Sequence, residues 1–142
     1  MPSGEAFTDG QQREITRAVT TASAETGLHF SIFVGNPEGS PRDYAERLHA
    51  ALGRKAAQAV LVLVAPGGRH LEVVTGPEAS RRIPDRACAL AGLSMRAAFA
   101  GGDLCGGIVT GVRMLAETAG ARAIAGGGAH GGSAHAALGS RY

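Results

Sequence analysis

The segment "AVLVLVAPGGRHLEVVT", residues 59–75, carries the strongest indication of the fold class of this chain. Its first seven residues, 59–65, are apolar throughout, which is typical of a central strand covered on both faces. The segment "PGGR" (66–69) has the composition of a turn, and "HLEVVT" (70–75) predicts a returning strand. We therefore expect an antiparallel hairpin inside the sheet.

The segments before this hairpin predict a helix, a strand and a second helix. Thr8 and Gln11 have the spacing of a capping box, which opens a predicted helix over residues 8–26. Apolar residues alternate in "LHFSIFVG" (28–35), as in a half-buried strand. Ser40 then has the position of an N-cap, because a proline and an acidic residue follow it.

Two helices are expected after the hairpin. They cover residues 85–99 and 103–118, are capped by Asp85 and Asp103, and the second is closed by Gly120. The predicted order is helix, strand, helix, strand, strand, helix, helix. A small sheet buries both of its faces only when helices lie on each side. We therefore predict an α/β fold, a three-layer α/β/α sandwich with a small mixed sheet containing one antiparallel hairpin.

The chain length favours one domain. It has 142 residues, of which 44% are hydrophobic and 18% are charged, an ordinary globular composition. From residue 119 onward, 15 of 24 residues are Gly or Ala. We expect a single domain over residues 1–118 and a disordered tail over residues 119–142.

Charge and hydropathy argue against two classes of partner. The net charge is +2, and the fourteen basic residues divide evenly, seven in residues 1–76 and seven in 77–142, so no basic patch predicts nucleic-acid binding. The longest apolar runs fall far short of the roughly 20 residues that span a bilayer, and no signal peptide is visible. We expect a soluble, cytoplasmic protein with an unidentified protein partner.

The two cysteines, Cys88 and Cys105, lie in segments with a helical pattern, which indicates free thiols in a reducing compartment. If Asp85 is the N-cap of its helix, Cys88 occupies the third helical position. There, unpaired N–H groups and Arg86 would favour a thiolate, whereas the carboxylate of Asp85 competes for the same groups. We keep a reactive Cys88 as a hypothesis beside the alternative of a small buried side chain.

Gly107 and Gly111 form a G-x-x-x-G spacing in the last predicted helix. Without a membrane span, this spacing more often allows close helix packing within one fold than dimerisation. We expect these glycines to lie at a helix contact in the core.

The segment "TGPEASRRIPD" (75–85) carries the candidate site. In one interpretation, Glu78, Asp85 and Asp103 lie in turns or at helix starts and converge at one end of the sheet, where carboxylates can hold a hard cation. In the other, their roles are structural: Asp85 caps a helix and Glu78 pairs with Arg82 four residues later. The convergent arrangement makes Glu78, Asp85 and Asp103 the predicted metal ligands.

Over residues 8–118 the chain resembles the TPM domain family, which includes thylakoid-lumen photosystem II repair proteins. The resemblance rests on an ordered set of segments: a helix ending in "ETG", then "YAERL", "AVLVLVA", "TGPEASRRIPD" and "FAGGDLCGGIVTGVRMLA". The residues that occupy matching places are Gly76, Glu78, Asp85 and Asp103. The resemblance implies an α/β/α sandwich, calcium binding and a weak acid-phosphatase activity.

Two functional hypotheses follow. Phosphatase, hydrolase and nucleophile-elbow motifs are absent from the sequence, so the leading hypothesis is a non-enzymatic protein interaction or assembly module. The alternative is a calcium-dependent or other divalent-metal-dependent phosphatase that uses Asp85 and Asp103, with Glu78 as a further ligand. The spatial separation of the three carboxylates discriminates between them.

Overall fold

The computed structural model of the chain describes residues 7–124 and 136–141. The described elements begin with a helix, a strand, two helical segments and two strands, and then continue with three helices and a last strand. They are α2 (Asp9–Thr26), β1 (His29–Val34), α3 (Pro41–Ala50), the 3-10 helix η1 (Gly53–Gln58), β2 (Ala59–Ala65), β3 (His70–Thr75), α4 (Pro77–Arg82), α5 (Asp85–Ala100), α6 (Leu104–Ile124) and β4 (Ala136–Arg141).

The helix starts form as the local sequence predicts. At the start of α2, the hydroxyl of Thr8 accepts a hydrogen bond from the N–H of Gln11, and the Gln11 side chain accepts one from the N–H of Thr8. Gly27 ends α2 with a φ of 78°, a conformation that glycine adopts without strain. Ser40 caps α3, which has proline in its first turn.

The sheet is mixed and has the order β1-β2-β3-β4. β1 pairs with β2 in parallel, whereas β2 with β3 and β3 with β4 are antiparallel. The turn between β2 and β3 closes with Ala65 opposite His70, and Arg69 within it has a positive φ of 59°. The predicted hairpin is therefore confirmed.

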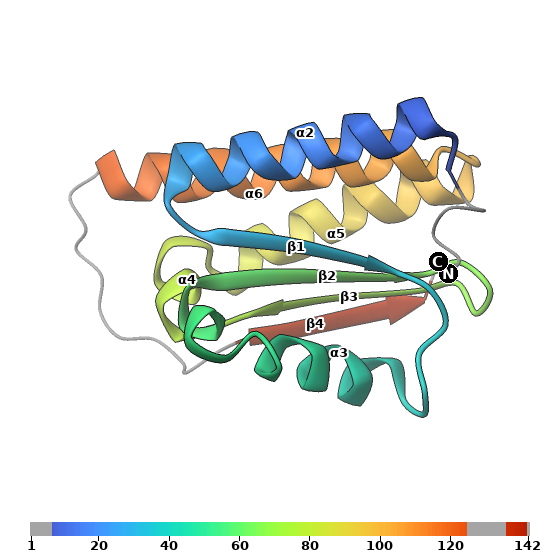
Figure 1. Ribbon diagram of the computed structural model, residues 1–142, viewed down its shortest axis with the longest axis horizontal. Coiled ribbons are helices and arrows are strands. Elements are labelled where there is room, and N and C mark those ends of the chain that lie inside the picture. The colour runs from blue at the N-terminus through green and yellow to red at the C-terminus, as the bar shows by residue number, and fades with distance from the viewer. Residues whose placement is uncertain (1–6, 125–135, 142) are drawn as a thin grey trace.

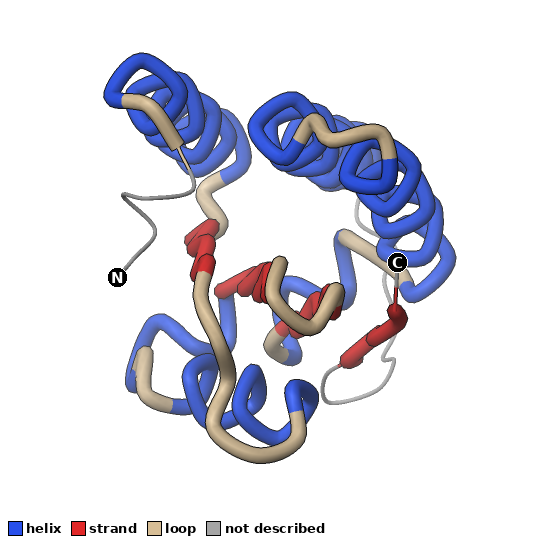
Figure 2. Tube along the Cα trace, turned by 90° about the vertical axis from the view of Figure 1, so that its right-hand side faces the viewer, coloured by secondary structure: helices blue, strands red, loops and turns tan. Residues whose placement is uncertain are grey.

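The elements form three layers, which are visible edge-on in Figure 2. Helices α2, α5 and α6 cover one face of the sheet, and α3 lies on the other (Figure 1). The predicted three-layer α/β/α sandwich is confirmed. No helix in the described part of the chain is long and apolar enough to cross a bilayer.

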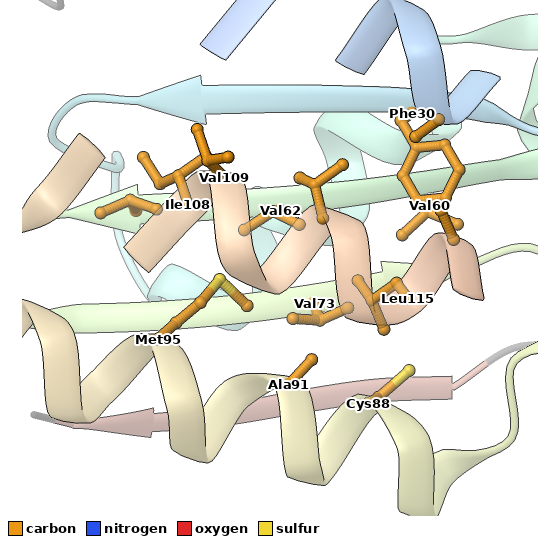
Figure 3. Packing of buried hydrophobic residues seen from close by; sticks show 14 of the residues in the cluster. Phe30, Val60, Val62, Val73, Cys88, Ala91, Met95, Ile108, Val109 and Leu115 are labelled. Atoms are coloured by element: carbon orange, nitrogen blue, oxygen red, sulfur yellow. The ribbon is translucent and has the colours of Figure 1, made fainter. Parts of the chain in front are cut away.

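Every residue of β2 is buried, because both faces of this strand are covered. Alternate strand side chains divide between two clusters. Val60, Val62 and Val64 face α2, α5 and α6, where they meet residues such as Met95, Ile108 and Leu115 (Figure 3). Leu61 and Leu63 face α3 with Val74 and Ala45.

Helices α5 and α6 pack closely because glycines lie at their contact. A Cβ atom on Gly107 would come within 2.7 Å of the Phe99 ring, and one on Gly111 within 2.6 Å of Met95. The prediction that the G-x-x-x-G spacing serves internal packing is confirmed.

The predicted disordered tail is wrong at both of its ends. Helix α6 does not stop at Gly120 but continues to Ile124, since alanine, the strongest helix former, dominates this segment. Residues 136–141 form β4 and pair with β3, whose outer N–H and C=O groups would otherwise be unpaired. The remainder of the predicted tail, 125–135 and 142, lies outside the described residues.

Candidate functional site

The three predicted metal ligands do not form one site. Asp85 begins α5, whereas Asp103 follows its end. A helix of 16 residues with a rise of about 1.5 Å per residue separates them by about 24 Å. Calcium ligands lie roughly 2.3–2.6 Å from the ion, so both cannot bind one cation. Within the described ranges, no group of three His, Cys, Asp or Glu side chains could hold a metal ion.

Each carboxylate instead has a local environment. Oδ1 of Asp103 accepts a hydrogen bond of 2.8 Å from the N–H of Gly106, so the prediction that Asp103 caps α6 is confirmed. Glu78 accepts one of 3.2 Å from Nε2 of Gln58. Asp85 is exposed in the first turn of α5, whose N-cap is Pro84, so the prediction that Asp85 caps this helix is wrong. Calcium binding by this set has no geometric basis.

The role of Arg82 was missed by the sequence analysis. Its guanidinium donates hydrogen bonds to the carbonyl oxygens of Thr26, at 2.7 Å, and Ala119, at 3.4 Å. Thr26 ends α2 and Ala119 lies in the last turns of α6, where a positive charge is favourable. The predicted pair of Glu78 and Arg82 is wrong, because Arg82 joins two helices across the fold.

Both thiols are free, and both are buried. Cys88 is 1% exposed; burial, together with the negative charge of Asp85, raises its pKa to about 12. Burial and a hydrogen bond to Glu14 raise the pKa of Cys105 to about 11. Cys88 is therefore protonated at neutral pH, and the hypothesis of a reactive Cys88 is wrong.

Glu72 is a buried acid in β3 that the sequence analysis did not single out. It is 6% exposed, and its Oε1 atom has no hydrogen-bond partner among the described residues. Burial raises its pKa; the nearby charge of Arg42 opposes this rise and that of Glu46 adds to it. One available signal was the position of this charged residue between Leu71 and Val73, in the strand predicted to pair with the wholly apolar segment 59–65.

The outer face of α5 is apolar and uncovered. Among the described residues, the large hydrophobic side chains that are exposed are Leu90 and Leu93, at 54% and 57%. Ala97 and Ala100 continue the same face toward the end of the helix, and both are exposed. We call Leu90, Leu93, Ala97 and Ala100 the α5 strip.

A groove of about 430 Å³ runs beside the strip, between α5 and α6. Its apolar lining includes Pro84, Ala87, Leu90, Met114 and Ala121, and Arg86 and Glu117 also line it. A second groove, of about 400 Å³ between α2 and α6, is lined by five charged residues, among them Glu14, Arg17 and Arg113. The first groove therefore extends the apolar surface of the strip, whereas the second has a polar character.

The fold and this surface define a small α/β/α domain with an exposed apolar helix face. The chain belongs to the family of domains of unknown function called DUF5130, whose model matches residues 1–116. This match overturns the assignment to the TPM family, which rested on an ordered set of short segments of low individual specificity. No curated protein matches the chain.

Two solved structures are similar in fold. One is the BA42 protein from the psychrophilic bacterium Bizionia argentinensis, with a TM-score of 0.72 and 17% identity over 80% of this chain and 81% of that chain. The other is the N-terminal domain of a protein from P. gingivalis, with a TM-score of 0.72 and 14% identity over 82% and 78%. At such identities the likeness concerns the fold alone.

Proposed function

We propose that this domain is a non-enzymatic protein interaction or assembly module and that the α5 strip is its docking face. The observation that carries the proposal is the exposure of Leu90 and Leu93, three residues apart on one helix. Side chains three apart lie on the same helix face, so the two leucines form one continuous apolar surface. Such surfaces, bordered by polar residues, are typical of protein interaction sites.

The chemistry of the other candidate groups supports a role without catalysis. Asp85 and Asp103 lie at opposite ends of α5, and Cys88 and Cys105 are protonated and buried. A phosphatase that uses the three predicted carboxylates would need them in one place, so we do not retain that alternative. Two free, buried thiols also suit a reducing compartment, and we include a cytoplasmic location in the proposal.

A photo-crosslinking experiment tests this function. A photo-reactive residue replaces Ala97, within the strip, or Ala24, an exposed alanine near the end of α2 that serves as the matched control. Both versions are irradiated in extract from the source cells. We expect one defined crosslinked species from position 97, its loss after Leu93→Glu in the same chain, and no such species from position 24. Equal labelling from both positions, or labelling that survives Leu93→Glu, would contradict the proposal.

A further inference from the structure

We propose that the occupant of the α5 strip is α5 of a second copy of this chain, packed antiparallel about a two-fold axis between Leu90 and Leu93. This inference rests on the proposed function and names its partner.

The spacing of the strip is that of a helix–helix seam. Leu90, Leu93, Ala97 and Ala100 follow one another at intervals of three, four and three residues, as alternating core positions do in paired helices. A two-fold axis between the leucines places Leu90 of each copy opposite Leu93 of the other. The same axis places Arg86 opposite Ala97. The small alanine side chains allow the two helices to approach closely.

The charges on α5 favour the antiparallel direction. The first turn of α5 carries Asp85, and its last turn carries no basic residue. An antiparallel partner supplies that charge, because its exposed Arg86 lies beside the last turn, where a cation is stabilised by the helix dipole. A parallel partner would instead place Asp85 against Asp85 and Arg86 against Arg86. Like charges at such distances are unfavourable.

Helix α6 contributes to the edge of the same interface. Gly107 meets Phe99 and Gly111 meets Met95 across the α5–α6 contact, so the point between Leu90 and Leu93 is level with Met114 and Leu115. Met114 lines the groove between α5 and α6, so the two-fold axis brings the apolar grooves of the two copies to the edge of the contact.

The size of the contact sets its strength. One helix of 16 residues is about 24 Å long, and a stable protein–protein interface buries roughly 1,200–2,000 Å² in total. A contact between two α5 helices with edges from α6 reaches only the lower end of this range. The dimer is accordingly weak and depends on protein concentration.

Sedimentation equilibrium of the full chain, from about 10 µM to about 1 mM, tests the association. We expect the average mass to rise from the monomer value of 14.3 kDa toward twice that value. Ala97→Arg weakens the association by about tenfold or more, because it places a second cation opposite Arg86 of the other copy and each substitution enters the symmetric contact twice. The matched control Ala24→Arg, at an exposed alanine of α2, leaves it unchanged. A constant 14.3 kDa, or equal effects of the two variants, overturns the inference.

Disulfide trapping tests the direction. Arg86→Cys and Ala97→Cys proteins are mixed in a buffer with oxidised glutathione. The buried Cys88 and Cys105 do not compete. In an antiparallel pair formed by one copy of each variant, the two new cysteines face each other. In a pair formed by two copies of the same variant, the new cysteines lie about 16 Å apart along the helix axis, which is too far for a disulfide. We expect a disulfide dimer from the mixture and none from either variant alone. A dimer from each single variant at the rate of the mixture contradicts the antiparallel arrangement.

The results separate this inference from the function on which it rests. If the chain remains monomeric but is crosslinked at position 97 to a different protein, the proposed interaction function holds and a second copy is excluded as the partner. If the chain is monomeric and no crosslink depends on Leu93, both proposals are wrong.

Discussion

The two faces of the sheet differ in how they are covered. On one face, α2, α5 and α6 pack on Val60, Val62 and Val64 and form a large apolar cluster. On the other, the short helix α3 covers a small cluster around Leu61 and Leu63. We call the α3 side the thin layer and the side with three helices the thick layer. The thin layer also contains a buried acid, Glu72, and an edge-to-face contact between Phe33 and Tyr44, with Arg47 over the tyrosine ring.

The unequal cover of the two faces indicates which side of the sheet contributes more to the stability of the fold. Hydrophobic stabilisation grows with the apolar area removed from water, so the layer with three helices contributes most of it. The α3 layer, which has fewer apolar neighbours, can relax around a change more easily. The predictions below test this division.

The largest effect is expected from a cavity in the thick layer. Leu115, in α6, and Leu63, in β2, are both fully buried and lie in clusters on opposite sides of the sheet. Leu115→Ala is expected to lower the free energy of unfolding by about 3–5 kcal/mol, and Leu63→Ala by about 2–3 kcal/mol, because the thin layer collapses onto the smaller side chain more completely. Urea denaturation followed by circular dichroism measures both. A larger loss for Leu63→Ala would reverse the assignment of stability to the two faces.

The close contact of α5 and α6 gives a second, smaller effect within the thick layer. A Cβ on Gly107 meets Phe99 and Ala98, whereas one on Gly120, in the same helix, meets nothing within 4 Å. Gly107→Ala is therefore expected to destabilise the domain by about 1–3 kcal/mol through overpacking. Gly120→Ala, the matched control, is expected to stabilise it by about 0.5–1 kcal/mol through helix propensity. Thermal unfolding of the two variants checks the opposite signs, and a shared sign would exclude overpacking as the cause.

Much of the fold could be predicted from the sequence because its signals are local. The capping box at Thr8, the N-cap at Ser40 and the apolar strand over 59–65 each depend on residues within a few positions. Strand β4 could not be predicted in this way, because its segment is rich in Gly and Ala and its pairing with β3 joins positions some 66 apart. That pairing depends on an open sheet edge, which is a property of the fold.

The candidate site was less predictable for the same reason. The convergence of Glu78, Asp85 and Asp103 was inferred from their positions at turns and helix starts, but α5 separates the last two by its whole length. The bonds of Arg82 to Thr26 and Ala119 join three helices, so no local pattern indicates them. The exposure of Leu90 and Leu93 likewise depends on which face of α5 the sheet covers.

Glu72 offers the smallest of these effects and the sharpest test of the thin layer. Burial raises its pKa above the ordinary value of 4.5 in the folded state, so the folded chain holds this proton more tightly than the unfolded chain. The protonated acid therefore contributes stability that is fully present below pH 4.5 and is lost as the pH rises through the folded-state pKa.

Glu72→Gln removes this titration and keeps the shape of the side chain. We expect the variant to match the wild type near pH 4 and to exceed its stability by about 1 kcal/mol or less at pH 8, where the wild type holds a buried carboxylate with an unpaired oxygen. Glu38→Gln, at an exposed position, provides the control and is expected to track the wild type at both pH values. Urea midpoints measured from pH 4 to pH 9 supply the comparison. If the difference in urea midpoint between Glu72→Gln and wild type does not grow with pH, the α3 layer opens to water around the carboxylate. The thin layer would then contribute even less to stability than its small apolar cluster indicates.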